Sequence, residues 1–179
     1  KKYPEFGEKI KVITWPKGMD KLFALRDFIV KDKNDDEIIK ATSAWLLLDV
    51  KSNKPKRIEN LKLDLHINKD KHAIEKKPEK IVSANCEKSY ERNVSLTEID
   101  LNKHVNNAKY LNWILDCFEM DFVINNSVKT IQVNFLAEAI YGNKINVNFC
   151  FIDENLKRCY IEGENAVDKV KIFQSFVEF

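Results

Sequence analysis

A weak internal repeat constrains the fold of this chain more than any other feature of its sequence. Residues 5–12 are EFGEKIKV and residues 140–147 are IYGNKINV, and each copy is followed by segments that alternate in a similar way. Alternation of apolar and polar residues is typical of a β-strand with one face toward a core. The repeat therefore predicts two copies of one sheet-forming unit.

The first copy is predicted to be three long antiparallel strands. The strand-like segments are KIKVITW, LFALRDFIV and IIKATSAWLLLDV, and KDKNDDE forms a polar turn between the last two. β-Branched and aromatic residues are frequent in all three segments, as is usual in strands.

The second copy is predicted to contain one helix as well as strands. YERNVSLTEID suggests a strand, and a helix then starts near Asn106 or Asn107. Spacings of three and four residues predict its buried face, which comprises Ala108, Leu111, Leu115 and Phe118. Four strand-like segments follow: VKTIQVNFLAEAI, KINVNFCFID, KRCYIEGENA and KVKIFQSFVEF. This order predicts an α+β fold in which a long antiparallel sheet wraps one helix.

The two copies differ at their starts. In the second copy a strand and a helix, over residues 89–120, precede Gly142, whereas only six residues precede Gly7. We therefore expect the first copy to lack its opening strand and helix in this chain. An uncovered sheet would expose large apolar side chains at a cost of several kcal/mol, so we expect an N-terminally shortened form, or a start that is only partly represented.

Composition divides the chain into three parts. Residues 51–80 hold ten Lys or Arg and five Asp or Glu, whereas the whole chain has a net charge of only +2. This predicts a basic surface linker between an incomplete first domain at residues 1–50 and a complete second domain at 81–179. The lysines of the linker are also candidates for binding an acidic partner.

Charge and cysteine content exclude several classes of protein. The near-neutral net charge argues against binding to nucleic acid, and no stretch approaches the roughly 18 apolar residues of a membrane span. The four cysteines form no C-x-x-C pair and have no close histidine spacing that would suggest zinc. We therefore expect reduced thiols and a cytoplasmic location.

The segment DLNKHVNN, residues 100–107, carries the candidate chemistry. Asp100, Asn102 and His104 alternate in a predicted strand-to-helix loop, so their side chains can face one site. The free N–H groups of the following helix can stabilise a carbonyl oxygen that gains negative charge, and histidine can move a proton near neutral pH. That combination suits acyl transfer. The alternative is a simple helix cap, in which the asparagines only bind N–H groups of the first turn.

DLNKHVNNAKYLNWILD closely resembles the D-x-N-x-H-V-N-N-x-x-Y-x-x-W segment of acyl-acyl carrier protein thioesterases. The resemblance extends to YPEFGEKIKVITWPKG, LFALRDFIV and ATSAWLLLD in the first half, and to VNFLAEAIYGNKI in the second. It implies two tandem hot dog domains, each an antiparallel sheet wrapped around a helix. The implied reaction is hydrolysis of fatty acyl thioesters on acyl carrier protein (ACP) in fatty acid biosynthesis, without metal or other cofactor.

The resemblance also implies roles for individual residues. Asp100, Asn102, His104 and Glu138 fall on its catalytic positions. The backbone N–H groups of Val105 and Asn106, at the start of the helix, are the candidates for holding the oxyanion. In the first domain the candidate substrate-binding residues are Trp15, Arg26 and Trp45, although aromatic residues in strands more often serve packing.

Ala139 departs from the pattern of the family. Plant members have a cysteine directly after the glutamate, and here that position is Ala139. A cysteine–histidine pair is therefore excluded. Either Glu138 or His104 activates water, which we favour, or Asp100 attacks the thioester carbon.

Two rival functions remain at this point. One is an acyl-coenzyme A thioesterase of the same fold, and the other is a non-catalytic module that binds acyl chains, since a fold does not fix a function. The oligomeric state is open, with a homodimer as one alternative.

Overall fold

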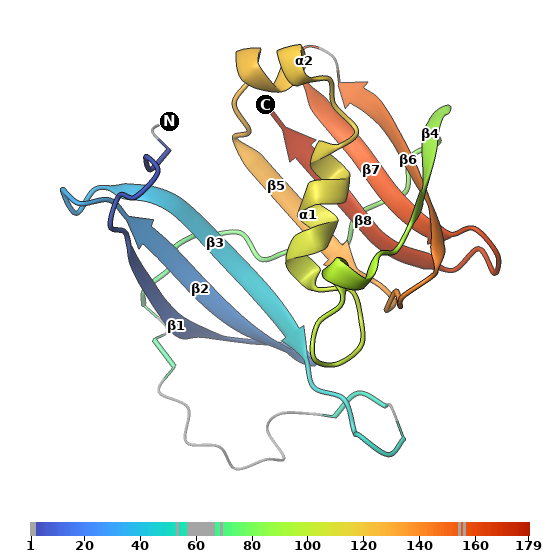
Figure 1. Cartoon of the computed structure of the whole chain (residues 1–179). Coiled ribbons are helices and arrows are strands. Elements are labelled where there is room, and N and C mark those ends of the chain that lie inside the picture. Colours follow the sequence, from blue (N-terminus) through green and yellow to red (C-terminus); the bar gives the residue numbers. More distant parts are fainter. Residues whose placement is uncertain (1–2, 53, 57–66, 69, 154, 156) are drawn as a thin grey trace. The chain divides into compact units, whose positions relative to one another are not determined.

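The computed structural model describes residues 3–52, 54–56, 67–68, 70–153, 155 and 157–179. It consists of two compact units, Lys1–Glu79 and Lys80–Phe179 (Figure 1). The middle of the expected linker, residues 57–66, lies outside the described residues.

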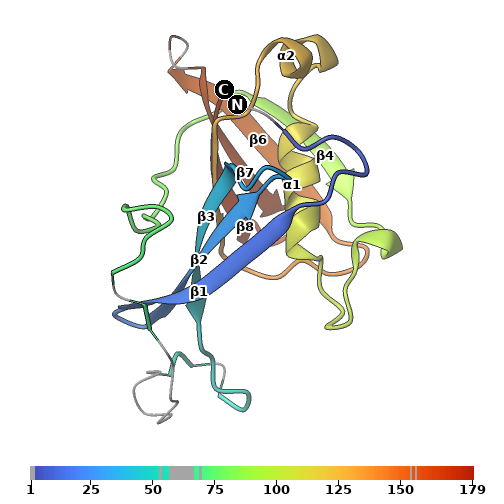
Figure 2. The same cartoon turned by 90° about the vertical axis from the view of Figure 1, so that its left-hand side faces the viewer.

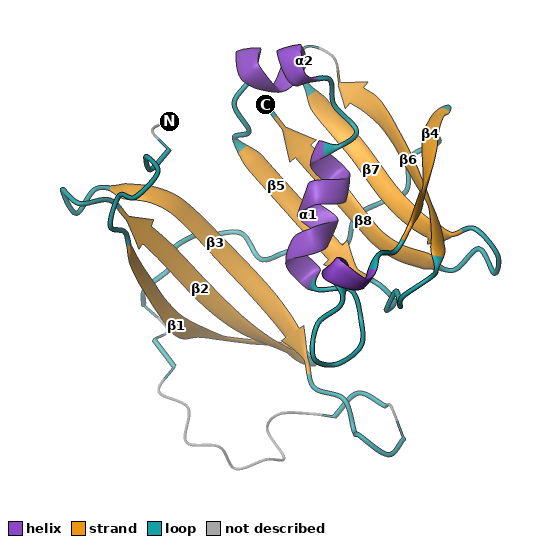
Figure 3. Cartoon of the chain, in the orientation of Figure 1, coloured by secondary structure: helices purple, strands orange, loops and turns teal. Residues whose placement is uncertain are grey.

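The first unit is a three-stranded antiparallel sheet (Figure 3). Its strands are β1 (Lys11–Asp20), β2 (Phe23–Lys31) and β3 (Glu37–Leu46), in the order β1-β2-β3. The three predicted strands are confirmed, although β3 ends four residues early because Leu48 leaves the sheet and pairs with Pro55.

One face of this sheet is buried beneath the end of the expected linker. Trp15, Ile29 and Ala73 form its apolar cluster. The indole N–H of Trp15 donates to the Lys71 carbonyl at 2.9 Å, and the Ala73 N–H donates to the Asp27 carboxylate at 2.7 Å. Residues 71–73 therefore belong to the packing of the first unit, rather than to a separate linker.

The second unit is a five-stranded antiparallel sheet with two helices. The strands are β4 (Lys88–Asn93), β5 (Thr130–Phe135), β6 (Lys144–Asp153), β7 (Arg158–Asn165) and β8 (Lys171–Glu178), in the order β4-β6-β7-β8-β5. Helix α1 (Asn107–Leu115) lies across one face of the sheet in both views (Figures 1 and 2). The short helix α2 (Met120–Asn125) was not predicted.

The core of the second unit lies between α1 and the sheet. Trp113 and Ile114 of α1 meet Val147, Ile161 and Phe173 from the strands, and all five are fully buried. Each such side chain stabilises the fold by about 1.5–3 kcal/mol.

The buried face predicted for the helix is wrong within α1, although Phe118, which lies beyond its end, does pack against the core. Leu111 and Leu115 are 38% and 40% exposed, whereas Tyr110, Trp113 and Ile114 are buried. These three also follow the helical spacing of three and four residues, so the same pattern supports either face. The larger aromatic side chains occupy the core.

The repeat is visible in the backbone. Gly7 and Gly142 both have φ of 82°, which is the left-handed region that glycine adopts readily. The sheet order β1-β2-β3 of the first unit matches β6-β7-β8 of the second. Within the described part of the first unit there is no counterpart of β4, α1 or β5.

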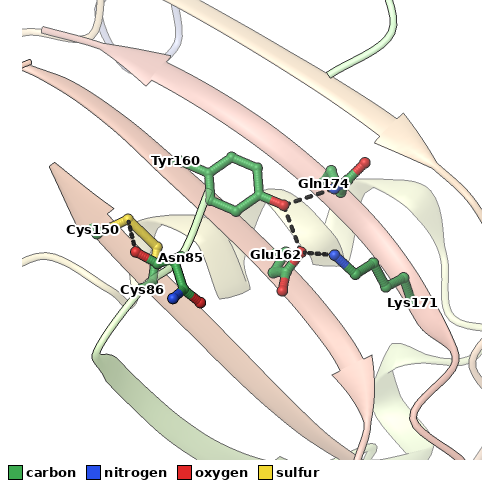
Figure 4. The surroundings of a disulfide bond; sticks show 7 residues. All are labelled: Asn85, Cys86, Cys150, Tyr160, Glu162, Lys171 and Gln174. Atoms are coloured by element: carbon green, nitrogen blue, oxygen red, sulfur yellow. Dashed lines mark hydrogen bonds and ion pairs between the residues drawn. A yellow bond between two sulfur atoms is a disulfide. The ribbon is translucent and has the colours of Figure 1, made fainter. Parts of the chain in front are cut away.

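The cysteines differ from the expectation of four reduced thiols. Cys86 and Cys150 form a disulfide, and only Cys117 and Cys159 are free (Figure 4). The two paired residues lie just beyond the β4–β6 pairing of Lys88 with Phe149, so the bond continues that ladder. Spacing along the sequence could not reveal a pair that the sheet brings together.

Among the described residues, no helix has the length and apolar character needed to cross a membrane.

Candidate active site

Asp100 folds the loop that precedes α1. One carboxylate oxygen accepts hydrogen bonds from the N–H groups of Asn102, at 2.8 Å, and His104, at 3.4 Å. The Asp100 N–H donates in turn to the His104 carbonyl at 2.8 Å. Lys103, with φ of 68°, makes the tight bend between them. The Asp100 side chain therefore shapes the loop that presents His104.

His104 and Glu138 form the central pair of the site. Nε2 of His104 lies 3.1 Å from a carboxylate oxygen of Glu138. A β-bridge between His104 and Ile140 aligns the loop with the segment that follows β5, which brings the two side chains together. The side chains of His104 and Glu138 are 35% and 71% exposed, so both are accessible from solvent. A neutral imidazole can donate one N–H to the carboxylate and keep a lone pair on its other nitrogen.

The helix start contradicts one prediction and confirms another. The Asn106 side chain accepts the N–H of Ala108 at 2.9 Å, so the capping role is confirmed. However, the Val105 N–H donates to the Ala139 carbonyl at 2.8 Å and the Asn106 N–H donates to the Glu98 carbonyl at 2.9 Å. The prediction that these two N–H groups hold an oxyanion is therefore wrong, because both already have acceptors.

Asn107 contributes a further backbone N–H at the start of the helix. It is the first residue of α1, and among the hydrogen bonds of the described residues its N–H has no acceptor. Its position at the helix N-terminus adds the positive end of the helix dipole.

These residues surround one pocket of about 460 Å³ within the second unit. Polar side chains from the loop meet apolar ones from α1 and from the end of β5. The lining residues are Asp100, Asn102, His104, Val105, Asn106, Asn107, Tyr110, Phe135, Leu136, Ala137 and Glu138. The structure thus brings together all four predicted catalytic side chains, in a cavity of the size that binds small ligands.

Tyr110 also lines this pocket, although it was not among the candidate site residues of the sequence. Burial, together with the negative charge of Glu138, raises the pKa of Tyr110 to about 12. The side chain is therefore a neutral hydroxyl at physiological pH. Its position three residues after Asn107, on the same helix face, is the signal that places it here.

Ala139 points away from the pocket. It is fully buried in the core of the second unit, whereas its neighbour Glu138 lines the cavity. Neighbouring residues in extended chain point to opposite sides. A thiol at position 139 would therefore face the core.

The candidates of the first unit do not form one cluster. Trp15 is 8% exposed and pairs across the sheet with Asp27 on the buried face. Arg26 occupies the opposite face, where its guanidinium donates to Thr14 at 3.2 Å. Trp45 is 58% exposed and donates to Ser43 at 2.7 Å. Trp15 is thus a packing residue, while Arg26 and Trp45 remain accessible.

The described residues contain no cluster of three or more His, Cys, Asp or Glu side chains able to hold a metal ion.

An antiparallel sheet that wraps one helix, with polar side chains gathered at the helix N-terminus, defines a hot dog domain, and the repeated unit makes this a double hot dog chain. Comparison with known proteins agrees. Residues 1–64 match the acyl-ACP thioesterase N-terminal domain and residues 80–170 match the acyl-ACP thioesterase C-terminal domain. The chain belongs to the acyl-ACP thioesterase family.

Relatives in this family include plant enzymes. The chain is 26% identical over 145 residues to acyl-[acyl-carrier-protein] hydrolase FATB1, chloroplastic, of Cuphea viscosissima, covering 76% of this chain and 35% of the relative. It is 21% identical over 185 residues to the chloroplastic oleoyl-acyl carrier protein thioesterase of Coriandrum sativum, covering 94% and 47%. The chain thus spans a third to a half of the length of these relatives.

A solved structure has the same fold. The acyl-ACP thioesterase of Bacteroides thetaiotaomicron superposes with a TM-score of 0.79 at 24% identity, covering 96% of this chain and 69% of that one.

Proposed function

We propose that this chain hydrolyses the thioester of fatty acyl-ACP and releases free fatty acid and the carrier thiol. The observation that carries this proposal is the His104–Glu138 pair, 3.1 Å apart, in a pocket at the N-terminus of α1. Membership of the acyl-ACP thioesterase family supports it, as do the names of the relatives.

The His104–Glu138 pair acts as one acid–base unit. It takes a proton from water as the water oxygen attacks the thioester carbon, and it returns a proton to the thiolate when the tetrahedral intermediate collapses. Direct attack by Asp100 is disfavoured, because one of its carboxylate oxygens already accepts two backbone N–H groups. This leaves water as the nucleophile.

The other pocket residues place the substrate. The Asn107 N–H stabilises the oxyanion that forms on the carbonyl oxygen, and the Asn102 side chain holds the water or the carbonyl group. Phe135, Leu136 and Tyr110 contribute apolar surface for the acyl chain. From the first unit, Arg26 and Trp45 are proposed to contact the substrate, since both are accessible.

The test is release of free fatty acid from acyl-ACP and acyl-coenzyme A thioesters. Glu138→Ala and His104→Ala are each expected to lower kcat by about 10²- to 10⁴-fold, the usual contribution of a general acid or base. Glu91→Ala is the matched control, because Glu91 is also an exposed, paired glutamate of the second unit, with Lys144 at 3.2 Å. It should retain wild-type turnover.

The same assay decides between the rival functions. Binding of acyl chains without turnover would show a non-catalytic module, and equal turnover of both thioesters would favour the acyl-coenzyme A thioesterase. Ala139→Cys should not raise kcat, because the thiol would lie in the core. A large gain would contradict the water mechanism.

Two further proposals concern the cellular location and the oligomeric state of the chain. A cytoplasmic location is proposed from the absence of paired-cysteine motifs in the sequence, but the Cys86–Cys150 disulfide argues against a reducing compartment, and the plant relatives named above are chloroplastic. Trapping of thiols in intact cells tests it through the redox state of Cys86 and Cys150. A homodimer is supported by the half-exposed Leu111 and Leu115 on α1, and sedimentation measures it.

A further inference from the structure

Glu98 is a buried carboxylate that lies directly before the site loop and outside the pocket. It is 8% exposed and ends the short 3-10 turn Leu96–Glu98. One of its oxygens accepts the backbone N–H of Ser95 at 2.8 Å and the Ser95 hydroxyl at 3.0 Å. These bonds fix the carboxylate relative to its own turn.

The other oxygen of Glu98 connects the turn to α1 and β4. It accepts the indole N–H of Trp113 at 2.7 Å and pairs with the guanidinium of Arg92. Arg92 comes from β4, and its guanidinium carbon lies 4.3 Å from the centre of the Trp113 ring. Trp113 is fully buried in the second turn of α1. Three elements therefore meet at a single side chain.

The main chain of Glu98 closes the site loop. Its carbonyl accepts the N–H of Asn106 at 2.9 Å. The loop 99–105, which carries Asp100, Asn102 and His104, thus begins and ends at bonded residues. Glu98 holds the N-cap residue of α1 through its backbone and the second turn through its side chain.

We propose that Glu98 is a positioning residue, which sets α1 against the site loop so that the Asn107 N–H and the His104–Glu138 pair address the same carbonyl group. This inference rests on the proposed function. A displacement of about 1 Å in an active site can cost a hundredfold in rate.

The charge state of Glu98 agrees with this role. Burial opposes its ionisation, but hydrogen bonds from Ser95 and Trp113 and the charge of Arg92 outweigh burial and lower the pKa of Glu98. The carboxylate is therefore ionised at neutral pH and accepts from all its donors.

Glu162 provides a matched control within the same unit. It is also 8% exposed, and it accepts the Tyr160 hydroxyl at 2.5 Å and pairs with Lys171 at 2.7 Å (Figure 4). In the strand register, however, Glu162 alternates with Ile161, whose side chain faces α1, so it lies on the opposite face of the sheet. Among the described residues, its hydrogen bonds and ion pair go to Tyr160 and Lys171, neither of which lines the pocket.

The experiment compares Glu98→Ala, Glu98→Gln, Trp113→Phe and Glu162→Gln in the full chain. We expect Glu98→Ala to lower kcat at least tenfold, with KM changed by less than twofold. Glu98→Gln, which keeps an acceptor for Trp113, should recover part of this loss. Trp113→Phe, which keeps the packing but removes the N–H, should also lower kcat, whereas Glu162→Gln should leave it unchanged.

Two outcomes would overturn the inference. One is a folded Glu98→Ala variant with wild-type kcat, and the other is an equal loss of kcat in Glu162→Gln, which would indicate a general effect of stability.

A readout without turnover separates this inference from the proposed function. The chain has three histidines, so the His104 imidazole signal can be assigned with His104→Ala and titrated by NMR. We expect Glu98→Ala to move this titration and Glu162→Gln to leave it in place. A wild-type chain without thioesterase activity would refute the proposed function, while an unmoved His104 titration would refute the positioning role.

Discussion

The two units of this chain share an arrangement of three antiparallel strands, but they differ in what packs against the sheet. In each, three antiparallel strands follow a left-handed glycine, Gly7 or Gly142. The described core of the first unit centres on Trp15, Ile29 and Ala73, whereas the second packs a complete helix against its sheet. The strands alone provide a scaffold, and the site arises where α1 and its preceding loop are added.

A buried carboxylate in each unit joins the sheet to a following segment. Asp27 of β2 is fully buried and holds Ala73 and Thr42, with the Lys17 ammonium 3.4 Å away. Glu98 of the second unit holds a helix instead. The buried carboxylate therefore stabilises the packing of the first unit, whereas in the second unit it also orders the loop that carries the candidate site.

Asp27→Ala is expected to have the largest effect, which is a loss of stability in the first unit. The change removes the carboxylate beside the buried ammonium of Lys17, which then keeps only the Ile74 carbonyl among the described residues, and breaking such a pair typically costs about 3–5 kcal/mol. The indole N–H signals of Trp15 and Trp45 report on the first unit, and that of Trp113 on the second. In Asp27→Ala we expect the Trp15 and Trp45 signals to be lost at a lower denaturant concentration than in the wild type. Asp35→Ala, at an exposed aspartate, is the control, and equal behaviour of both variants would contradict the importance of the buried pair.

Gly163→Ala should destabilise the second unit by about 1–3 kcal/mol through overpacking. A methyl group at Gly163 would collide with the ring of Phe173, which is fully buried against α1. Chemical denaturation measures the loss, and the Trp113 indole signal should shift because its ring lies 6.2 Å from Phe173. A shift of the Trp15 signal alone, without a shift of the Trp113 signal, would contradict this prediction.

Gly7→Ala and Gly142→Ala form a matched pair across the repeat. Both glycines have φ of 82° and open space around them, so each change should cost only about 1–2 kcal/mol of backbone strain. The effects on turnover should differ, because Gly142 follows the Ile140 bridge to His104. We expect a lower kcat for Gly142→Ala alone. Equal losses in fatty acid release would show that both turns matter equally to the site.

The smallest effect is expected from acid. Burial opposes ionisation of Glu162, but its bonds to Lys171 and Tyr160 lower the pKa of Glu162, as the partners of Glu98 do for that residue. A lowered pKa stabilises the fold above the unfolded value of about 4.5, and this stabilisation is lost as pH falls through the folded pKa. The free energy of unfolding of the second unit, measured by denaturation at several pH values, should therefore fall between pH 6 and pH 3. Glu98→Gln should make the stability depend less steeply on pH. An unchanged pH dependence would exclude the Glu98 carboxylate as its source.

Much of the fold follows from local patterns. The strands that alternate cleanly, such as KINVNFCFID, became β6 with its full length. The site was also visible, because Asp100, Asn102 and His104 follow one another in a short loop. Glu138 is distant in sequence, and only the family resemblance suggested it.

Other features depend on contacts that no local pattern encodes. The buried helix face depends on which of two equivalent spacings meets the sheet, and the larger side chains of Tyr110 and Trp113 decide it. The N–H groups of Val105 and Asn106 donate to the carbonyls of Ala139 and Glu98, so the proposed oxyanion donor is Asn107 and not the two residues that the sequence suggested. The S-x-x-E pattern of residues 95–98 is the one signal that could have indicated Glu98.

The disulfide between Cys86 and Cys150 closes a ring of chain with a sequence separation of 64 residues. All four candidate catalytic residues, from Asp100 to Glu138, lie inside this ring. A polypeptide cut between the two cysteines would therefore leave two fragments that remain covalently joined until they are reduced. For a ring of this size, the chain-entropy estimate of the bond's contribution to stability is about 4 kcal/mol. Proteolysis followed on gels with and without reductant would make the ring directly visible.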